Sequence, residues 1–179
     1  IGPSVPNIPV APNDFEYNLS SPLRASAGLT YFVGANGFLT ASVDYVGYRG
    51  INLSTTMLSA IDNTNFRQNN KAEIQDVFAN TVNFRLGGEY RRDMFRARAG
   101  IAYLSDPYRI QLDGINRSKL AISGGLGVRN DRFFADLSAT ALQFNSVFNP
   151  YLLPDVRDYD SASISNLRTN FTLSIGTFF

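Results

Sequence analysis

The chain has 179 residues, enough for one domain, and its 16 Lys and Arg residues nearly balance its 15 Asp and Glu residues. It therefore lacks the basic surplus of a nucleic-acid-binding protein. It also has no cysteine and no histidine, which excludes disulfides and thiolate metal sites and removes the usual general base. We expect no enzyme activity, no cofactor, no metal site and no nucleic-acid partner.

The N-terminal part of the chain is expected to be irregular. Residues 1–13 contain four prolines and no hydrophobic period, and proline cannot donate to a β ladder, so we predict a loop there. Residues 15–20 are expected to include a short extended piece. The chain begins at Ile1 and carries no secretory signal peptide, so we expect that it is processed or belongs to a longer polypeptide.

Seven later segments show apolar residues at every second position, which is typical of strands with two different faces. The predicted strands are 22–33, 38–52, 79–91, 94–104, 118–129, 132–144 and 168–179. Most run for eleven to thirteen residues, longer than the five or six of ordinary sheets. A tilted membrane-spanning strand needs about 9–11 residues, whereas no segment approaches the ~18 apolar residues of a transmembrane helix.

The connections between these strands alternate between short and long. Tight turns are predicted near residues 35, 92 and 130, and long loops near 65, 111 and 155. The helical spacing of Ile74, Val77 and Phe78 predicts a short surface helix late in the first long loop. Outer-membrane barrels have this alternation, with the short turns in the periplasm and the long loops outside the cell.

The two predicted faces differ in charge. One carries charged residues within the strands: Arg24, Asp44, Arg85, Glu89, Arg96, Arg98, Lys119 and Asp136. The other carries no charge in mid-strand, and Tyr31, Tyr45, Tyr90 and Tyr103 lie near its strand ends, as in the aromatic girdle of a barrel. We therefore predict an antiparallel transmembrane β-barrel with these charges in its lumen; a soluble β-sandwich does not fit the uncharged face or the strand length.

The charged face has two interpretations. It is a salt-bridge network that orders the wall of the barrel, or it is a site for the carboxylate of a ligand. Asp44 and Asp136 fall on distant strands, which disfavours an acid/base pair. The GGLG stretch at 124–127 lies within a strand and is no nucleotide loop. The acidic stretches at 62–65 and 158–160 are expected to be solvated loops rather than Ca²⁺ sites.

Seven strands cannot close an ordinary barrel, because single-chain bacterial barrels have an even number. We expect the chain to be the C-terminal half of a larger barrel, with residues 22–179 in the wall and residues 1–21 as the Pro-rich remnant of an extracellular loop. Its partners are then outer-membrane lipid and the N-terminal half of the same barrel, on the same or a separate chain. The C-terminus is expected in the periplasm and the long loops outside the bacterial cell.

Several stretches resemble the C-terminal half of the FadL-type outer-membrane transporters of hydrophobic compounds, and most of all their branch in the Bacteroidota. They are FEYNLSSPLRASAGLTYF, GFLTASVDYVGY, NFRLGGEYRRDMFRARAGIAYLSDPY and RFFADLSATAL, and the resemblance covers nearly all of residues 14–179. It implies a barrel of about fourteen strands and passive uptake of fatty-acid-like hydrophobic molecules. The hatch and the best-known lateral gap of that family lie in the N-terminal half.

Two further expectations follow from this resemblance. The machinery that inserts such barrels reads a last strand with alternating apolar residues, which implies an insertion signal at Phe171, Leu173, Ile175 and Phe179. The alternative function is a FadL-like barrel that serves as a structural or carrier subunit, bound to other outer-membrane proteins in a secretion or surface complex.

Overall fold

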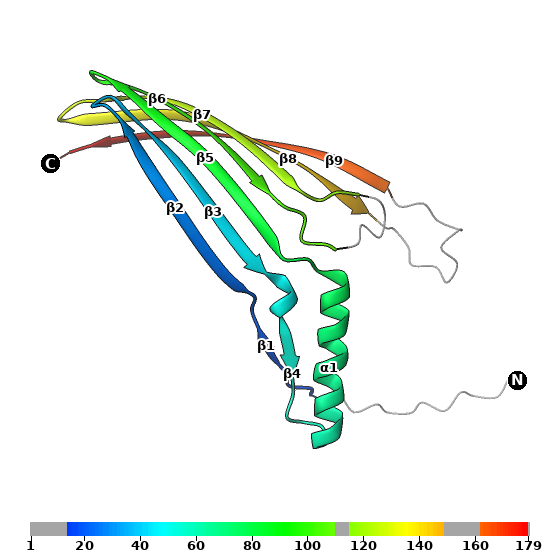
Figure 1. Cartoon of the computed structure of the whole chain (residues 1–179). Coiled ribbons are helices and arrows are strands. Elements are labelled where there is room, and N and C mark those ends of the chain that lie inside the picture. Colours follow the sequence, from blue (N-terminus) through cyan, green and yellow to red (C-terminus); the bar gives the residue numbers. More distant parts are fainter. Residues whose placement is uncertain (1–13, 110–114, 149–161, 179) are drawn as a thin grey trace, which may run out of the picture.

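The computed structural model describes residues 14–109, 115–148 and 162–178. Its main feature is one seven-stranded antiparallel sheet in the order β2-β3-β5-β6-β7-β8-β9 (Figure 1). The strands are β2 (Leu23–Val33), β3 (Gly37–Gly47), β5 (Thr81–Arg92), β6 (Phe95–Leu104), β7 (Lys119–Arg129), β8 (Phe133–Phe148) and β9 (Ala162–Thr177). The predicted antiparallel β-rich fold and its seven long strands are confirmed.

The strand register turns the alternation of the sequence into two chemically distinct faces. Leu86 on β5 lies opposite Ala41 and Ile101, whereas Glu89 on the same strand lies opposite Phe38 and Arg98. Directly opposed residues of an antiparallel pair point to the same side of the sheet, so each kind of residue extends across neighbouring strands. We call the side that carries Glu89 the polar face and the side that carries Leu86 the apolar face.

The apolar face has a band of uncharged side chains that has the same length, counted in residues along the strand, on four neighbouring strands. Its side chains on β5, β6, β7 and β8 carry no charge over four nine-residue spans, 82–90, 95–103, 120–128 and 133–141. Polar residues follow at both ends, with Arg92 at the turn end of β5 and Gln143 and Asn145 at the loop end of β8. The large side chains in the band are exposed, and Leu126 is 70% exposed.

The four predicted girdle tyrosines lie near strand ends on the apolar face. Tyr31 and Tyr90 are close to the short turns, and Tyr45 and Tyr103 are close to the long connections. The band of apolar side chains is thus bordered by tyrosines on both sides along β2, β3, β5 and β6.

Three short turns join strands at one end of the sheet, as predicted. Gly34 has a φ of 59° and Asp93 a φ of 53°, a left-handed conformation that Gly and Asp tolerate better than most residues. In the third turn the Asn130 side chain accepts hydrogen bonds from the backbone N–H groups of Arg132 and Phe133, both at 2.8 Å. These local features fix the register of the hairpins on either side.

Some predicted boundaries are wrong. The predicted strand 38–52 ends at Gly47, because the chain turns into the 3-10 helix η1 (Tyr48–Gly50) before it enters the short strand β4 (Asn52–Ser54). β8 and β9 are longer than predicted and pair up to Phe148 and Ala162. Beyond the apolar band the alternation changes sides. Gln143 and Asn145 lie on the apolar face and Leu142, Phe144 and Phe148 lie on the polar face, while the backbone ladder continues.

The predicted short helix is in fact long and begins well before the predicted segment. Helix α1 (Ala60–Val77) starts at Ser59, whose side chain accepts a hydrogen bond from the backbone N–H of Asp62. It ends before Phe78, which is extended. No helix in the described part of the chain is long and apolar enough to cross a membrane.

Helix α1 belongs to an arm that extends from the loop end of the sheet (Figure 1). Its other parts are β1 (Asn18–Ser20) and β4, which form a two-stranded antiparallel sheet beside the helix. Phe15 and Phe66 make an edge-to-face contact at 5.8 Å between ring centroids.

The arm is joined to the main sheet by stacked aromatic rings. The Phe78 ring lies 6.1 Å from Tyr48 and 5.4 Å from Tyr108 between centroids. The backbone N–H of Arg109 also donates to the carbonyl oxygen of Val77 at 2.8 Å, which satisfies one of the last carbonyls of α1. The helix is therefore anchored to the sheet at its C-terminal end.

Two glycines of the sheet provide a matched test of its close packing. A Cβ atom at Gly37 would lie 2.8 Å from the backbone oxygen of Glu89, whereas the nearest atom to a Cβ at Gly124 is 3.8 Å away. We predict that Gly37→Ala lowers the free energy of unfolding by about 1–3 kcal/mol. Gly124→Ala is expected to be neutral or to stabilise by about 0.4–1 kcal/mol. Denaturant unfolding followed by circular dichroism measures both; equal effects of the two changes would contradict the described packing.

Candidate functional site

All eight charged residues predicted to share a face lie on the polar face. They are Arg24 on β2, Asp44 on β3, Arg85 and Glu89 on β5, Arg96 and Arg98 on β6, Lys119 on β7 and Asp136 on β8. The structure brings six of them into ion pairs and leaves Arg24 and Lys119 outside these pairs. The polar face is therefore the candidate functional site.

Glu89 is the centre of the largest group. Its carboxylate accepts a hydrogen bond from Arg98 Nε at 2.5 Å and another from Arg91 Nε, and Arg96 Nη1 lies 3.6 Å away. The Glu89 side chain is only 6% exposed, since the three arginine side chains surround it. The antiparallel register explains this arrangement, because Glu89 lies opposite Arg98 and Arg91 lies opposite Arg96. Without the carboxylate, three like charges would adjoin one another.

A second ion pair extends this group across a whole strand. Arg98 on β6 reaches over β7 to Asp136 on β8, with 2.9 Å between Nη1 and Oδ1. The residues of β7 beneath this bridge are Gly125 and Gly127, which pair with Arg98 and Asp136 respectively. A Cβ atom at Gly127 would collide with the Asp136 carboxylate. The GGLG stretch thus leaves room for side chains that cross the strand.

The remaining predicted residues are more separate. Asp44 and Arg85 form an ion pair between β3 and β5. The Lys119 ammonium lies 5.4 Å from the centre of the Phe144 ring, a cation–π contact. Arg24 makes no ion pair within the described ranges. Asp44 and Asp136 are separated by β5, β6 and β7, so they do not form an acid/base pair.

Positive charge dominates the polar face. In the main sheet it carries three carboxylates, Asp44, Glu89 and Asp136, against eight cations. The cations are Arg24, Arg85, Arg91, Arg96, Arg98, Lys119, Arg129 and Arg168. The whole chain has a net charge of only +1, so its acidic residues lie mostly outside this face. A face with this surplus attracts anions and repels cations.

Aromatic rings pair with arginines at the turn end of the polar face. The Arg91 guanidinium lies 5.3 Å from the Phe38 ring, and Arg129 lies 4.4 Å from the Phe178 ring, which also contacts Phe134 at 5.7 Å. The backbone N–H of Phe178 donates to the carbonyl oxygen of Arg132 at 2.8 Å. The end of the last strand is thereby held against the preceding hairpin.

The predicted insertion signal is only partly within the described residues. Phe171, Leu173 and Ile175 lie on the apolar face of β9 and are 65–76% exposed. Phe179 lies outside the described residues. The role of this strand in insertion stays a prediction.

The polar face offers fixed charges from several neighbouring strands. The described residues contain no cluster of acidic side chains suited to a metal ion. Residues 62–65 belong to the first turns of α1 rather than to a loop, and residues 158–160 lie outside the described ranges. Arg91 is a site residue beyond the eight predicted ones, and its position two residues after Glu89 places it on the same face. The arrangement can order the sheet and hold an anionic group.

Comparisons with known protein families, curated proteins and solved structures find no match to this chain.

The Glu89 carboxylate is expected to stabilise the sheet. Glu89→Gln keeps the shape of the side chain but removes the negative charge that Arg91, Arg96 and Arg98 share, and only Arg98 keeps a second carboxylate, Asp136, within the described residues. We predict a loss of about 2–3 kcal/mol in the free energy of unfolding. Asp136→Asn, at a carboxylate whose one ion pair within the described residues is with Arg98, should cost about 1 kcal/mol or less. Parallel denaturant titrations measure both changes. A Glu89→Gln variant as stable as the parent would contradict the central role of this group.

Proposed function

We propose that the sheet is part of the wall of a bacterial outer-membrane β-barrel that takes up hydrophobic, fatty-acid-like molecules by passive transport. The polar face then lines the lumen, and the apolar face contacts lipid. The observation that carries this proposal is the uncharged apolar band, which keeps the same nine-residue height on four adjacent strands.

The height of the band agrees with a membrane. Nine residues at about 3.3 Å each give roughly 30 Å of strand, and a tilt of ~40° reduces this to a little over 20 Å along the membrane normal. The apolar band of outer-membrane barrels is about 25 Å tall, with aromatic girdles on both sides. The positions of Tyr31, Tyr45, Tyr90 and Tyr103 fit these girdles.

The described sheet needs further strands to close. Its seven strands alternate in direction, so the outer strands β2 and β9 run parallel to each other, and their outer edges are unpaired in the described residues. Antiparallel closure therefore takes an odd number of added strands. A second copy on the same barrel axis would instead give two parallel seams. We propose a separate N-terminal half of about seven strands, as the FadL resemblance implies, with the short turns and the C-terminus in the periplasm and the long connections outside the cell.

The substrate class rests on that resemblance and on the charge of the polar face. A fatty-acid-like molecule combines an apolar tail with an anionic head group. The eight cations of the polar face, set against three carboxylates, suit such a head group.

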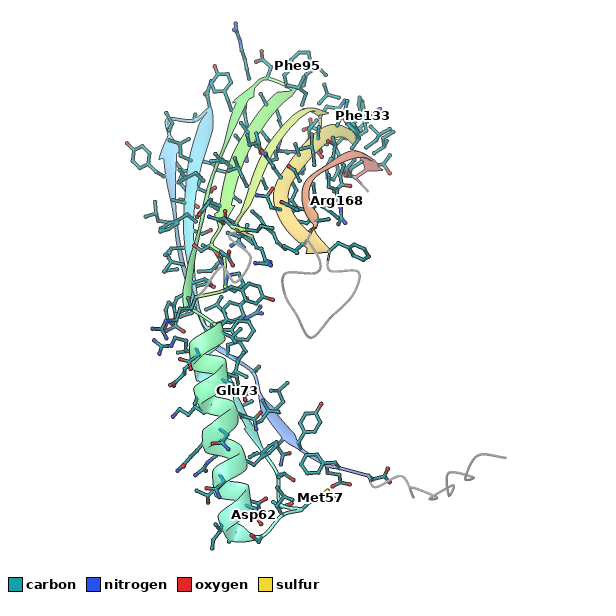
Figure 2. All side chains as sticks on the ribbon, turned by 90° about the vertical axis from the view of Figure 1, so that its right-hand side faces the viewer. Met57, Asp62, Glu73, Phe95, Phe133 and Arg168 are labelled. Carbon is teal, nitrogen blue, oxygen red and sulfur yellow. The ribbon has the colours of Figure 1, made fainter. Side chains whose placement is uncertain are left out.

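One observation favours a second function, a carrier or structural subunit of an outer-membrane protein complex. The arm extends from the sheet, with Met57 at its tip (Figure 2). Met57 and its near neighbours in sequence, Leu58 and Ile61, are large apolar side chains that stand exposed, with Ile61 at 75%. Exposed apolar side chains gathered at one point favour contact with another protein.

Insertion into lipid is tested by two adjacent residues of β9. Leu173 lies on the apolar face and Thr172 on the polar face, and both side chains are exposed. We predict that Leu173→Lys costs about 2–4 kcal/mol in a bilayer and strongly lowers the assembled amount in the outer membrane, whereas Thr172→Lys is tolerated. Heat-modifiable gel mobility of membrane fractions measures assembly. Equal tolerance of both lysines would contradict a lipid-facing β9.

A measurement of fatty-acid uptake by cells distinguishes transport from the carrier or structural function. Cells that produce the complete polypeptide should accumulate a fluorescent long-chain fatty acid several-fold faster than cells that produce the Leu173→Lys variant. Normal assembly without faster accumulation would contradict transport. If crosslinking then recovers a stoichiometric outer-membrane partner through the arm, the carrier function is favoured instead.

A further inference from the structure

The charges of helix α1 are separated onto two flanks. Asn63, Phe66, Asn70 and Ile74 form the side that packs against the rest of the arm. At about 100° per residue, the acidic residues Asp62, Glu73 and Asp76 fall on one flank of that side, and the cations Arg67 and Lys71 fall on the other. The helix thus presents a purely basic flank and a purely acidic one.

Two of the three carboxylates on the acidic flank have partners in the protein. Asp62 accepts a hydrogen bond from the hydroxyl of Ser59 at 2.7 Å at the start of the helix. Asp76 lies 3.5 Å from Arg109 at its end. Arg67 and Lys71 make no ion pair with any residue in the part of the chain that the structure describes. They are four residues apart, and like charges at this spacing destabilise a helix.

The basic flank faces a hollow. A cavity of about 470 Å³ lies between α1 and the segment that links η1 to β4, and its lining is Gly50, Ile51, Asn52, Arg67, Gln68 and Lys71. The four polar side chains all carry N–H donors, and none of the six residues is acidic. A second hollow of about 430 Å³ shares Gly50 and adds Arg49, Gln75 and Asn80 among its lining, again without a carboxylate.

We propose that the first hollow binds a phosphoryl group. A phosphate monoester carries a charge of about −1.5 to −2 at pH 7, which balances the charge of two cations. A ligand with a single carboxylate carries only half of the charge needed. The Arg67 guanidinium supplies a fork of donors, Lys71 a mobile point charge, and Gln68 and Asn52 amide N–H groups. A bound phosphate also relieves the repulsion between the two cations. The group comes from soluble phosphate or from the head group of a phosphorylated glycolipid, and the site is independent of transport through a barrel.

The two lysines of the chain, Lys71 and Lys119, provide an internal control. The native protein in detergent micelles is treated with an amine-reactive reagent, and each lysine is quantified by mass spectrometry. Inorganic phosphate, at constant ionic strength set with chloride, is expected to lower the labelling of Lys71 at least threefold and to leave Lys119 unchanged.

A second arm compares phosphatidylcholine nanodiscs with and without diphosphorylated lipid A. Protection by lipid A alone assigns the head group as the source; protection of Lys71 by neither probe overturns the proposal.

A matched pair of variants tests the same site by affinity. Arg67→Gln removes a cation from the hollow, and Arg109→Gln removes one from the pair with Asp76 on the other flank. Titration calorimetry with whichever probe protects Lys71 should give a dissociation constant at least tenfold higher for Arg67→Gln and within twofold of the parent for Arg109→Gln. Equal affinity of both variants overturns the proposal. If Arg67→Gln fails to fold, the protection of Lys71 from labelling in the unaltered protein tests the proposal by itself.

Discussion

The strand register is the constraint on which the other features of this protein depend. Because residues alternate in character along each strand, one fixed pairing places Glu89 opposite Arg98 and Leu86 opposite Ile101. A slip of one residue would move every charged side chain of that strand to the apolar face. The short turns hold the register from one end, through the backbone of Gly34 and Asp93 and the side chain of Asn130. At the other end the stacked rings of Tyr48, Phe78 and Tyr108 fix where the arm begins.

The ionic group on the polar face links the stability of the sheet to the charge of its surface. One carboxylate, Glu89, neutralises part of a cluster of three arginines, and Arg98 extends the group over two glycines to Asp136. Both carboxylates of this group are paired with arginines, and the polar face still has a surplus of positive charge. Substitutions here are therefore expected to alter both the rigidity of the sheet and its attraction for anions.

The sequence predicted the sheet well because the hydrophobic period is clear over most of its strands. It predicted seven strands, their faces and the short turns, and it placed Glu89, Arg96 and Arg98 on one face while leaving open whether they form a salt-bridge network or a ligand site. It failed where that period ends. β8 and β9 continue past the apolar band, where Asn145 and Ser165 occupy the apolar face and the apolar residues Phe144 and Phe148 lie on the polar face. The chain also turns into η1 at Tyr48, although Tyr is a common strand residue. Helix α1 is polar on most sides, so its start depends on the Ser59 cap rather than on a periodic pattern. The hollow at Lys71 forms only when η1 and β4 lie beside α1.

The central claim is that the two faces meet different solvents, water on the polar face and lipid on the apolar face. The chain has no cysteine, so single cysteines can be placed one at a time at positions 120–126 of β7 and spin-labelled in a bilayer. Collision rates with oxygen and with a water-soluble nickel chelate are then measured at each position. The account predicts that both rates alternate with a period of two and in opposite phase, with oxygen highest at positions 120, 122, 124 and 126 and the nickel chelate highest between them. Equal access of the nickel chelate to all seven positions would contradict it.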